Sequence, residues 1–283
     1  MPPKMIEYTA SLVGVQKAAT TTLHGILREH PGFARRNPKE IHFFDDENVD
    51  WSDPDYSEYA KRAKRPRERV ALDSTPSYIF IPNALRRMHD YRPEMKLIAA
   101  FRDPIDRAFS AWNMEFARRD TWPSFGQAVR DGQLSKVPPE STWKRIGSAK
   151  WDLVARGLYA QQLSRGLEVY PREQWLLMTF EQIVKDPTTA VNEVAQFIGL
   201  RPFEPETADK PRWSSPGGLD AAPVTAADIE LLASSYVDEL PAFVELTGFD
   251  ISMWTTSRVL AGELAPADVA ERLNKKAGLV LRP

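Results

Sequence analysis

The stretch Leu12-Val13-Gly14-Val15-Gln16-Lys17-Ala18-Ala19-Thr20-Thr21-Thr22-Leu23 decides the fold of this chain. Its apolar beginning predicts a buried opening strand, a tight turn with one lysine among small residues follows, and a helix is expected from there to about His30. In such a strand–turn–helix element, backbone N–H groups and the N-terminal end of the helix face a phosphate-like anion. The stretch therefore predicts an anion site at the end of the first strand.

The side chains of this turn suit that role. Ala18 and Ala19 are small enough for the backbone to approach an anion, Lys17 reaches a bridging or terminal oxygen, and the hydroxyls of Thr20–Thr22 cap the helix or bind oxygen. The turn is not a Walker A loop, because the nearby Gly14 lies three residues before the lysine and the motif G-x-x-x-x-G-K-[ST] is not present. On this stretch alone, an ordinary strand-to-helix connection with a solvated lysine remains open.

A second segment strengthens the prediction. Residues 96–101 form an apolar run typical of a buried parallel strand, and Arg102 follows at its carboxyl end, where ligands bind in open α/β sheets. Ser110 comes about two helical turns later and shares a ligand with Arg102 only if the cleft runs along that helix. An arginine fork and a neutral donor suit a phosphate monoester. The alternatives are an ion pair between Arg102 and a neighbouring aspartate, and a packing role for Ser110.

Five segments, taken together and in order, resemble sulfotransferases that use 3′-phosphoadenosine 5′-phosphosulfate (PAPS), in particular the branch of heparan sulfate sulfotransferases and their bacterial relatives. The resemblance covers roughly residues 8 to 250. The segments are Gly14–Thr21 (5′-phosphosulfate loop), Arg102–Ser110 (3′-phosphate motif), Lys39-Glu40-Ile41-His42-Phe43-Phe44-Asp45, Ser74-Thr75-Pro76-Ser77-Tyr78, and Gly157-Leu158-Tyr159-Ala160 followed by Phe180-Glu181.

The resemblance implies a PAPS-dependent, metal-independent transferase with the following site. Lys17 stabilises the leaving phosphate oxygen, and Glu40 occupies the position of the catalytic glutamate, with His42 two residues on as the other candidate base. If that segment is extended, both side chains point the same way. The structural alternative for Glu40 is an ion pair with Lys39. The donor-binding residues are expected to be Lys17, Ala18, Ala19, Thr20, Thr21, Thr22, Arg102, Ser110, Tyr159, Lys210 and Arg212.

One departure from the heparan-type pattern concerns the acceptor. Those enzymes often have Glu-Lys before Thr-Pro-Ser-Tyr, whereas this chain has Asp73-Ser74. The lysine that would help to hold a polyanionic sugar is absent, which favours a hydroxyl acceptor, or alternatively an amine, on a small molecule, lipid, glycoside or carrier-bound chain.

Composition and pattern set the wider expectations. With 283 residues, a net charge of −2 and no cysteine, the chain predicts an α/β enzyme without disulfides and gives no electrostatic reason to expect nucleic acid as a partner. No signal peptide or membrane span is expected, so a cytoplasmic location is predicted. Alternating strands and helices favour a central parallel sheet flanked by helices in one P-loop-like domain over 1–283, with a peripheral tail from about 255. The oligomeric state is not predicted.

The periodicity also predicts element bounds. Residues 120–150 read as a long irregular stretch. Helices are expected at 20–30, 54–63, 82–90, 104–118, 150–168, 187–198 and 226–238, and strands at 70–72, 96–101 and 175–179.

Two other functions remain open on the sequence. A P-loop small-molecule kinase would need the Walker A sequence and Mg²⁺, and a non-catalytic nucleotide-binding protein of the same fold would tolerate replacement of Lys17 and Glu40.

Overall fold

A computed structural model describes residues 8–33, 39–61, 70–119, 122–134, 152–206 and 219–279. Lys210 and Arg212 lie outside the described residues. The chain divides into two compact units: unit 1 comprises Met1–Arg102 and Arg165–Arg212, and unit 2 comprises Asp103–Ser164 and Trp213–Pro283. The expectation of one domain over 1–283 stays a prediction.

Unit 1 is built on a four-stranded parallel sheet, which confirms the predicted α/β fold. Its strands are β1 (Ala10–Gly14), β2 (Leu72–Asp73), β3 (Lys96–Phe101) and β4 (Trp175–Thr179), in the order β2-β1-β3-β4. All residues of β1 and nearly all of β3 are buried, as the continuous apolar runs predict for a parallel sheet covered on both faces. The bounds of β3 and β4 are those that the sequence predicts.

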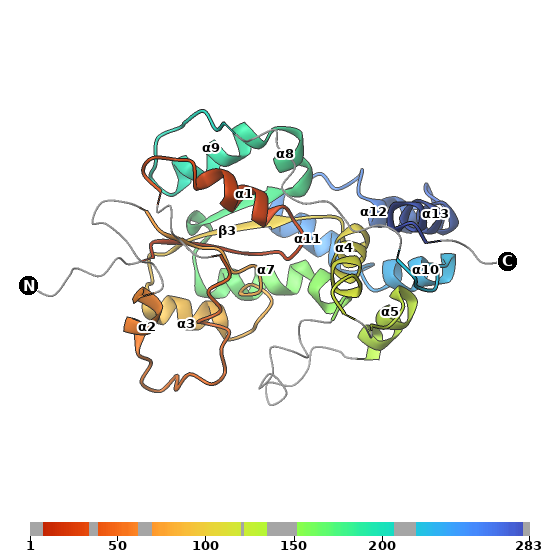
Figure 1. The fold of residues 1–283 in the computed structure, drawn as a ribbon, viewed down its shortest axis with the longest axis horizontal. Coiled ribbons are helices and arrows are strands. Elements are labelled where there is room, and N and C mark those ends of the chain that lie inside the picture. The colour runs from red at the N-terminus through yellow and green to blue at the C-terminus, as the bar shows by residue number, and fades with distance from the viewer. Residues whose placement is uncertain are drawn as a thin grey trace, which may run out of the picture. The chain divides into compact units, whose positions relative to one another are not determined.

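Helices lie on both sides of this sheet (Figure 1): α1, α8 and α9 gather above it, and α2 and α3 lie below. Their bounds are α1 Thr20–Leu27, α2 Tyr56–Lys61, α3 Ala84–Tyr91, α8 Phe180–Lys185 and α9 Pro187–Phe197. The predicted helix over 20–30 is three residues too long, because Pro31 disfavours helical backbone at the residue before it.

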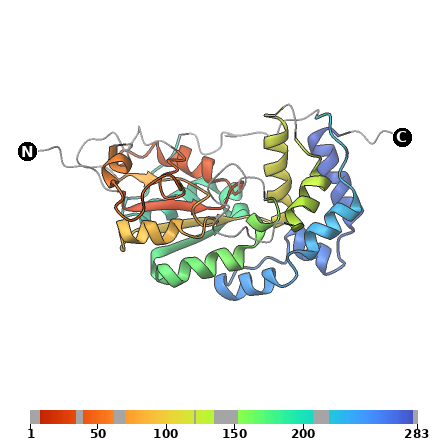
Figure 2. The same cartoon turned by 90° about the horizontal axis from the view of Figure 1, so that it is seen from below.

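Unit 2 consists of helices in the part of the chain that the structure describes (Figure 2). Trp112, Leu232, Phe243 and Leu273 contribute to its buried side chains. The helices of unit 2 are α4 Pro104–Phe116, α5 Phe125–Leu134, α10 Ala226–Ser234, α11 Glu239–Thr247, α12 Thr255–Leu260 and α13 Pro266–Ala277, with a 3₁₀ turn, η2, at Ala155–Gly157. The segment from 255 onward, expected to be peripheral, supplies two of them, α12 and α13. Helix α7 (Tyr159–Val169) begins in unit 2 and ends in unit 1.

Three predicted bounds in unit 2 are wrong. Residues 120–150 contain α5. The helix expected over 150–168 begins only at Tyr159, after the turn at Gly157, where an added Cβ would lie 2.5 Å from the Tyr236 hydroxyl. The helix expected over 226–238 ends at Ser234, where the hydroxyls of Ser234 and Ser235 both donate to the carbonyl of Leu231 and so compete with the helical ladder.

None of the helices in the described part of the chain is long and apolar enough to cross a membrane.

Candidate functional site

Two loops of unit 1 hold the predicted catalytic residues, Lys17, Glu40 and His42, and both have unusual backbone. Among the described residues other than glycine, positive φ angles occur at Lys17 (75°), Ala19 (60°), Glu40 (60°) and His42 (53°). Such conformations cost free energy and concentrate at functional sites, where the surrounding structure holds them. The loops predicted from sequence are therefore also the ones with strained backbone.

The first loop is the turn after β1. The Val15 N–H donates to the carbonyl of Ala100 at 2.7 Å, which fastens the turn to the end of β3. Helix α1 begins at Thr20, and its N-cap residue, Ala19, makes no side-chain hydrogen bond, so a role for the hydroxyls of Thr20–Thr22 stays a prediction. The first N–H groups of a helix have no partner within the helix. Together with Lys17, this N-terminus fits the predicted anion site.

Arg102 joins this turn from the carboxyl end of β3. Its Nη1 donates to the carbonyl oxygen of Lys17 at 3.1 Å, and its guanidinium lies 4.2 Å from the centre of the Phe180 ring. Only 9% of Arg102 is exposed. The structure thus brings together two segments that the sequence places 85 residues apart.

Ser110 and Tyr159 belong to unit 2. Ser110 is buried on α4, and Tyr159 begins α7 with its ring packed near those of Phe243 and Trp254. Their predicted contacts with the donor stay predictions.

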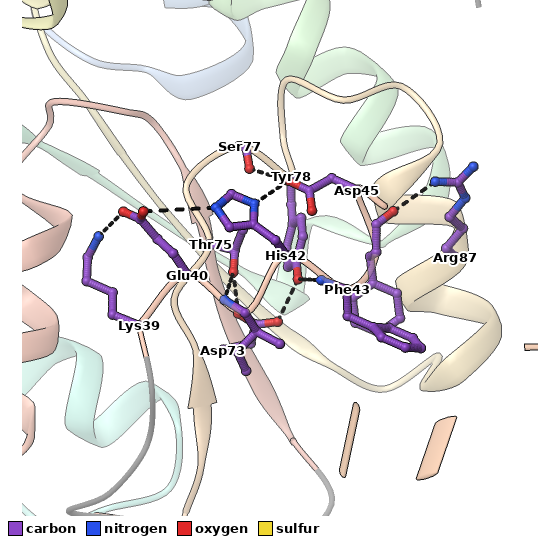
Figure 3. Close-up of polar contacts among 12 residues, drawn as sticks. Lys39, Glu40, His42, Phe43, Asp45, Asp73, Thr75, Ser77, Tyr78 and Arg87 are labelled. Atoms are coloured by element: carbon purple, nitrogen blue, oxygen red, sulfur yellow. Dashed lines mark hydrogen bonds and ion pairs between the residues drawn. The ribbon is translucent and has the colours of Figure 1, made fainter. Parts of the chain in front are cut away.

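The second loop, residues 39–45, lies beside the end of β2, since Lys39 forms a parallel bridge with Ser74. Glu40 forms an ion pair with Lys39, and its Oε2 lies 4.0 Å from Nε2 of His42 (Figure 3). The loop is not extended, because the backbone is left-handed at Glu40 and His42, yet the two side chains still face each other. The structural ion pair with Lys39 and the approach to His42 are both present.

Sequence reasoning missed Asp45, although it stands in the quoted motif three residues after His42. Its buried carboxylate accepts from Nδ1 of His42 at 2.8 Å and from the Ser77 hydroxyl at 2.6 Å. Because an ionised carboxylate only accepts hydrogen bonds, this contact places the proton of a neutral His42 on Nδ1 and leaves Nε2 as the lone-pair nitrogen toward Glu40.

Loop 74–78, directly after β2, is hydrogen-bonded to loop 39–45. The N–H of Glu40 donates to the carbonyl of Ser74. The N–H of Ile41 donates to the Thr75 hydroxyl and that of Phe43 to the Tyr78 hydroxyl (Figure 3). Loop 39–45 is therefore held to its neighbour by the backbone N–H groups of three of its residues.

Asp73 is buried beneath this loop pair. Burial raises the pKa of its carboxyl to about 6, against the opposing effect of hydrogen bonds from Thr75, Tyr78 and Tyr59. Ser74, at the position where heparan-type enzymes often carry lysine, is also fully buried and shares a 2.7 Å hydrogen bond with Nδ1 of His24.

Comparison with known proteins agrees with this geometry. Residues 9–212 match the family model for the sulfotransferase domain. The chain belongs to the sulfotransferase domain family. This confirms the family predicted from the motifs.

Individual members of the sulfotransferase family share about a quarter to a third of their residues with this chain over the matched segment. Mouse heparan sulfate glucosamine 3-O-sulfotransferase 6 is 34% identical over 199 residues, which cover 68% of this chain and 52% of that protein. Human bifunctional heparan sulfate N-deacetylase/N-sulfotransferase 3 is 26% identical over 68% of this chain and 22% of its own. The chain thus spans about half the length, or less, of these curated relatives.

Among solved structures, a sulfotransferase from Alicyclobacillus acidocaldarius superposes with a TM-score of 0.70 at 27% identity, covering 88% of this chain and 99% of that one. This bacterial sulfotransferase is matched over nearly its whole length. The fold around the parallel sheet is therefore that of a sulfotransferase.

Proposed function

We propose that this protein is a sulfotransferase that moves a sulfuryl group from PAPS to an acceptor hydroxyl. The observation that carries the proposal is the pair of strained loops beside the ends of neighbouring strands of one sulfotransferase-type sheet: the Lys17 turn, which follows β1, and loop 39–45, which lies beside the end of β2. One loop carries a cation beside a helix N-terminus, and the other carries a carboxylate beside an imidazole.

The residues present fit the donor. The Lys17 turn and the N-terminus of α1 would hold the 5′-phosphosulfate, because N–H groups and the helix dipole favour an anion there. Arg102 would bind the 3′-phosphate with Ser110, and Tyr159, Lys210 and Arg212 complete the proposed set. Arg102 is held by Lys17 and Phe180, so its fork is oriented before the donor arrives.

The reaction is an in-line displacement at sulfur. The acceptor oxygen forms a new S–O bond, the bond between sulfur and the donor's phosphate oxygen breaks, and that phosphate oxygen keeps the electron pair. Lys17 stabilises the charge that grows there, by analogy with phosphoryl transfer. The acceptor proton passes to a base, for which Glu40 is the first candidate and Nε2 of His42 the second.

The acceptor is proposed to be a hydroxyl, or alternatively an amine, of a small molecule, lipid, glycoside or carrier-bound chain. Support comes from Ser74, which is buried and bonded to His24 where a lysine would otherwise approach a polyanionic sugar.

We infer a cytoplasmic enzyme.

A thermal-shift screen of 3′,5′-adenosine bisphosphate (PAP) against ATP and GTP tests the donor. A preference for the bisphosphate supports the proposal, and a preference for ATP would favour the small-molecule kinase instead. Arg102→Ala should weaken bisphosphate binding about tenfold or more, since a charged hydrogen bond is worth about 1.5–3 kcal/mol.

Turnover tests the transfer step. Lys17→Ala should depress kcat much more than PAP affinity, because its interaction strengthens as the leaving oxygen gains charge. A loss confined to KM would reassign Lys17 to ground-state binding. Full activity of both the Lys17 and Glu40 variants would indicate a protein that binds the nucleotide without catalysing transfer.

A further inference from the structure

The strained backbone of loop 39–45 has to be held by something outside the loop. At Glu40 the partner is a backbone carbonyl, but at Ile41 and Phe43 the partners are the hydroxyls of Thr75 and Tyr78, at 3.0 and 3.2 Å. A hydroxyl accepts a backbone N–H reliably only if its own proton points elsewhere, because it has one proton and two lone pairs.

The carboxylate of Asp73 accepts the protons of both hydroxyls. The Thr75 hydroxyl donates to Asp73 Oδ1 at 2.6 Å, and the Tyr78 hydroxyl donates to Asp73 Oδ2 at 2.9 Å. As an acceptor-only group, the carboxylate draws both protons toward itself and leaves the lone pairs facing the N–H groups of Ile41 and Phe43 (Figure 3). Ile41 lies between Glu40 and His42, and Phe43 follows His42.

We propose that Asp73 is a positioning residue for sulfuryl transfer, which acts through the Thr75 and Tyr78 hydroxyls to hold Glu40 and His42 in their reactive backbone conformation. The inference rests on the proposed function, since it takes Glu40 or His42 as the base. Asp73 touches neither of them, and both relays pass through a hydroxyl to a backbone N–H.

Tyr59 provides a matched control within the same cluster. Its hydroxyl donates to the same oxygen, Asp73 Oδ2, at 3.0 Å, and its ring is fully buried like that of Tyr78. Unlike the Tyr78 hydroxyl, it accepts no N–H from loop 39–45. Tyr59→Phe and Tyr78→Phe therefore each remove one hydroxyl that donates to Asp73 Oδ2. Only Tyr78→Phe also removes the acceptor of the Phe43 N–H.

The experiment compares Asp73→Asn, whose side chain no longer offers two acceptor oxygens to the hydroxyls, with Thr75→Val, Thr75→Ser, Tyr78→Phe and Tyr59→Phe in the full chain. Misplacement of a reacting group by about 1 Å costs about 10²-fold in rate, so Asp73→Asn, Thr75→Val and Tyr78→Phe should each lower kcat by about 10–100-fold, and unchanged kcat in Asp73→Asn would remove Asp73 from the positioning role. PAP affinity should stay within about twofold, Thr75→Ser should rescue kcat, and Tyr59→Phe should keep kcat within about twofold while losing similar thermal stability to Tyr78→Phe. Equal loss of kcat in the two tyrosine variants, or unchanged kcat in Thr75→Val, would overturn the proposal.

A second readout separates this inference from the proposed function. The pKa of His42, followed by NMR titration of its imidazole, depends on how the loop is held and needs no turnover. It should move in Thr75→Val and Tyr78→Phe and stay in place in Tyr59→Phe. If it does so in a protein that transfers no sulfuryl group, the proposed function fails and the positioning role of Asp73 stands. If it moves in none or in all three, the positioning role fails.

Discussion

At the scale of single residues, Glu40 and His42 are the two candidates for the general base. Glu40 is half-exposed beside Lys39, whereas His42 is oriented by the buried carboxylate of Asp45. A general base contributes about 10²–10⁴ in rate. Glu40→Gln keeps the shape but takes no proton, so kcat should fall by about that factor with PAP affinity unchanged, and His42→Asn should cost less. Turnover of both variants across pH, with any accepted hydroxyl substrate, is the measurement; the reverse ranking would make His42 the base and Glu40 a structural ion pair.

Asp73 should leave a pH signature in stability. Because burial raises its pKa from an ordinary value near 3.8 to about 6, the folded state binds a proton that the unfolded state has lost between these pH values. The free energy of unfolding of the wild type, relative to Asp73→Asn, should therefore fall by up to about 1.4 kcal/mol per pH unit from pH 4 to about 6 and level off above it. Urea unfolding of both proteins at several pH values measures this difference; a flat difference would mean that the pKa of Asp73 is unshifted.

At the scale of elements, the end of β1 allows no side chain at Gly14. An added Cβ would lie 2.5 Å from Cγ2 of Ile79, whose N–H also donates to the carbonyl of Val13. Gly14→Ala should destabilise the fold by about 1–3 kcal/mol, the usual cost of overpacking. In an Ile79→Ala background, which lacks that Cγ2, the added cost should shrink, and a double-mutant cycle from urea unfolding measures the coupling. Additive effects would show that the two positions do not compete for space.

The same elements show what sequence reveals and what it does not. The runs 97–101 and 175–178 are continuously apolar, so the strands that contain them, 96–101 and 175–179, are predictable from the sequence. The left-handed backbone at Glu40 and His42 is not, because it depends on hydrogen bonds to residues more than thirty positions away. Asp45 and Asp73 each bond residues as near as two to five positions away, but the sequence does not show that these residues in turn hold or form the loop that carries Glu40 and His42.

At the scale of the whole molecule, unit 2 depends on the last described helix. Leu273 on α13 is fully buried, whereas its neighbour Arg272 forms a half-exposed ion pair with Asp106. Leu273→Ala should cost about 2–5 kcal/mol, as large-to-small changes in a core do. Arg272→Ala should cost less, about 1 kcal/mol, because the arginine end of this bidentate ion pair is nearly half-exposed. Chemical unfolding of both variants tests the contrast, and equal costs would mean that the ion pair stabilises α13 as much as the packing of Leu273 does.

Unit 2 also joins residues inside and outside the segment matched by the sulfotransferase family. The carboxylate of Asp103, at the start of α4, accepts the backbone N–H of Thr256 at 2.7 Å, and the Tyr236 hydroxyl donates to the carbonyl of Val154 at 3.0 Å. The family match ends at residue 212. The described part of the chain after that point therefore completes a unit that begins within the match.

The interleaving of the two units along the chain has a consequence for biosynthesis. Neither unit is a continuous stretch, since residues 103–164 separate the two parts of unit 1 and residues 165–212 separate those of unit 2. On a ribosome, β4 emerges only after the whole of α4 and α5, and α13 emerges after the other helices described in unit 2. At typical elongation rates of 5–20 residues per second, the first part of unit 2 waits on the order of ten seconds for its closing helix. During that interval its apolar faces are a natural target for chaperones.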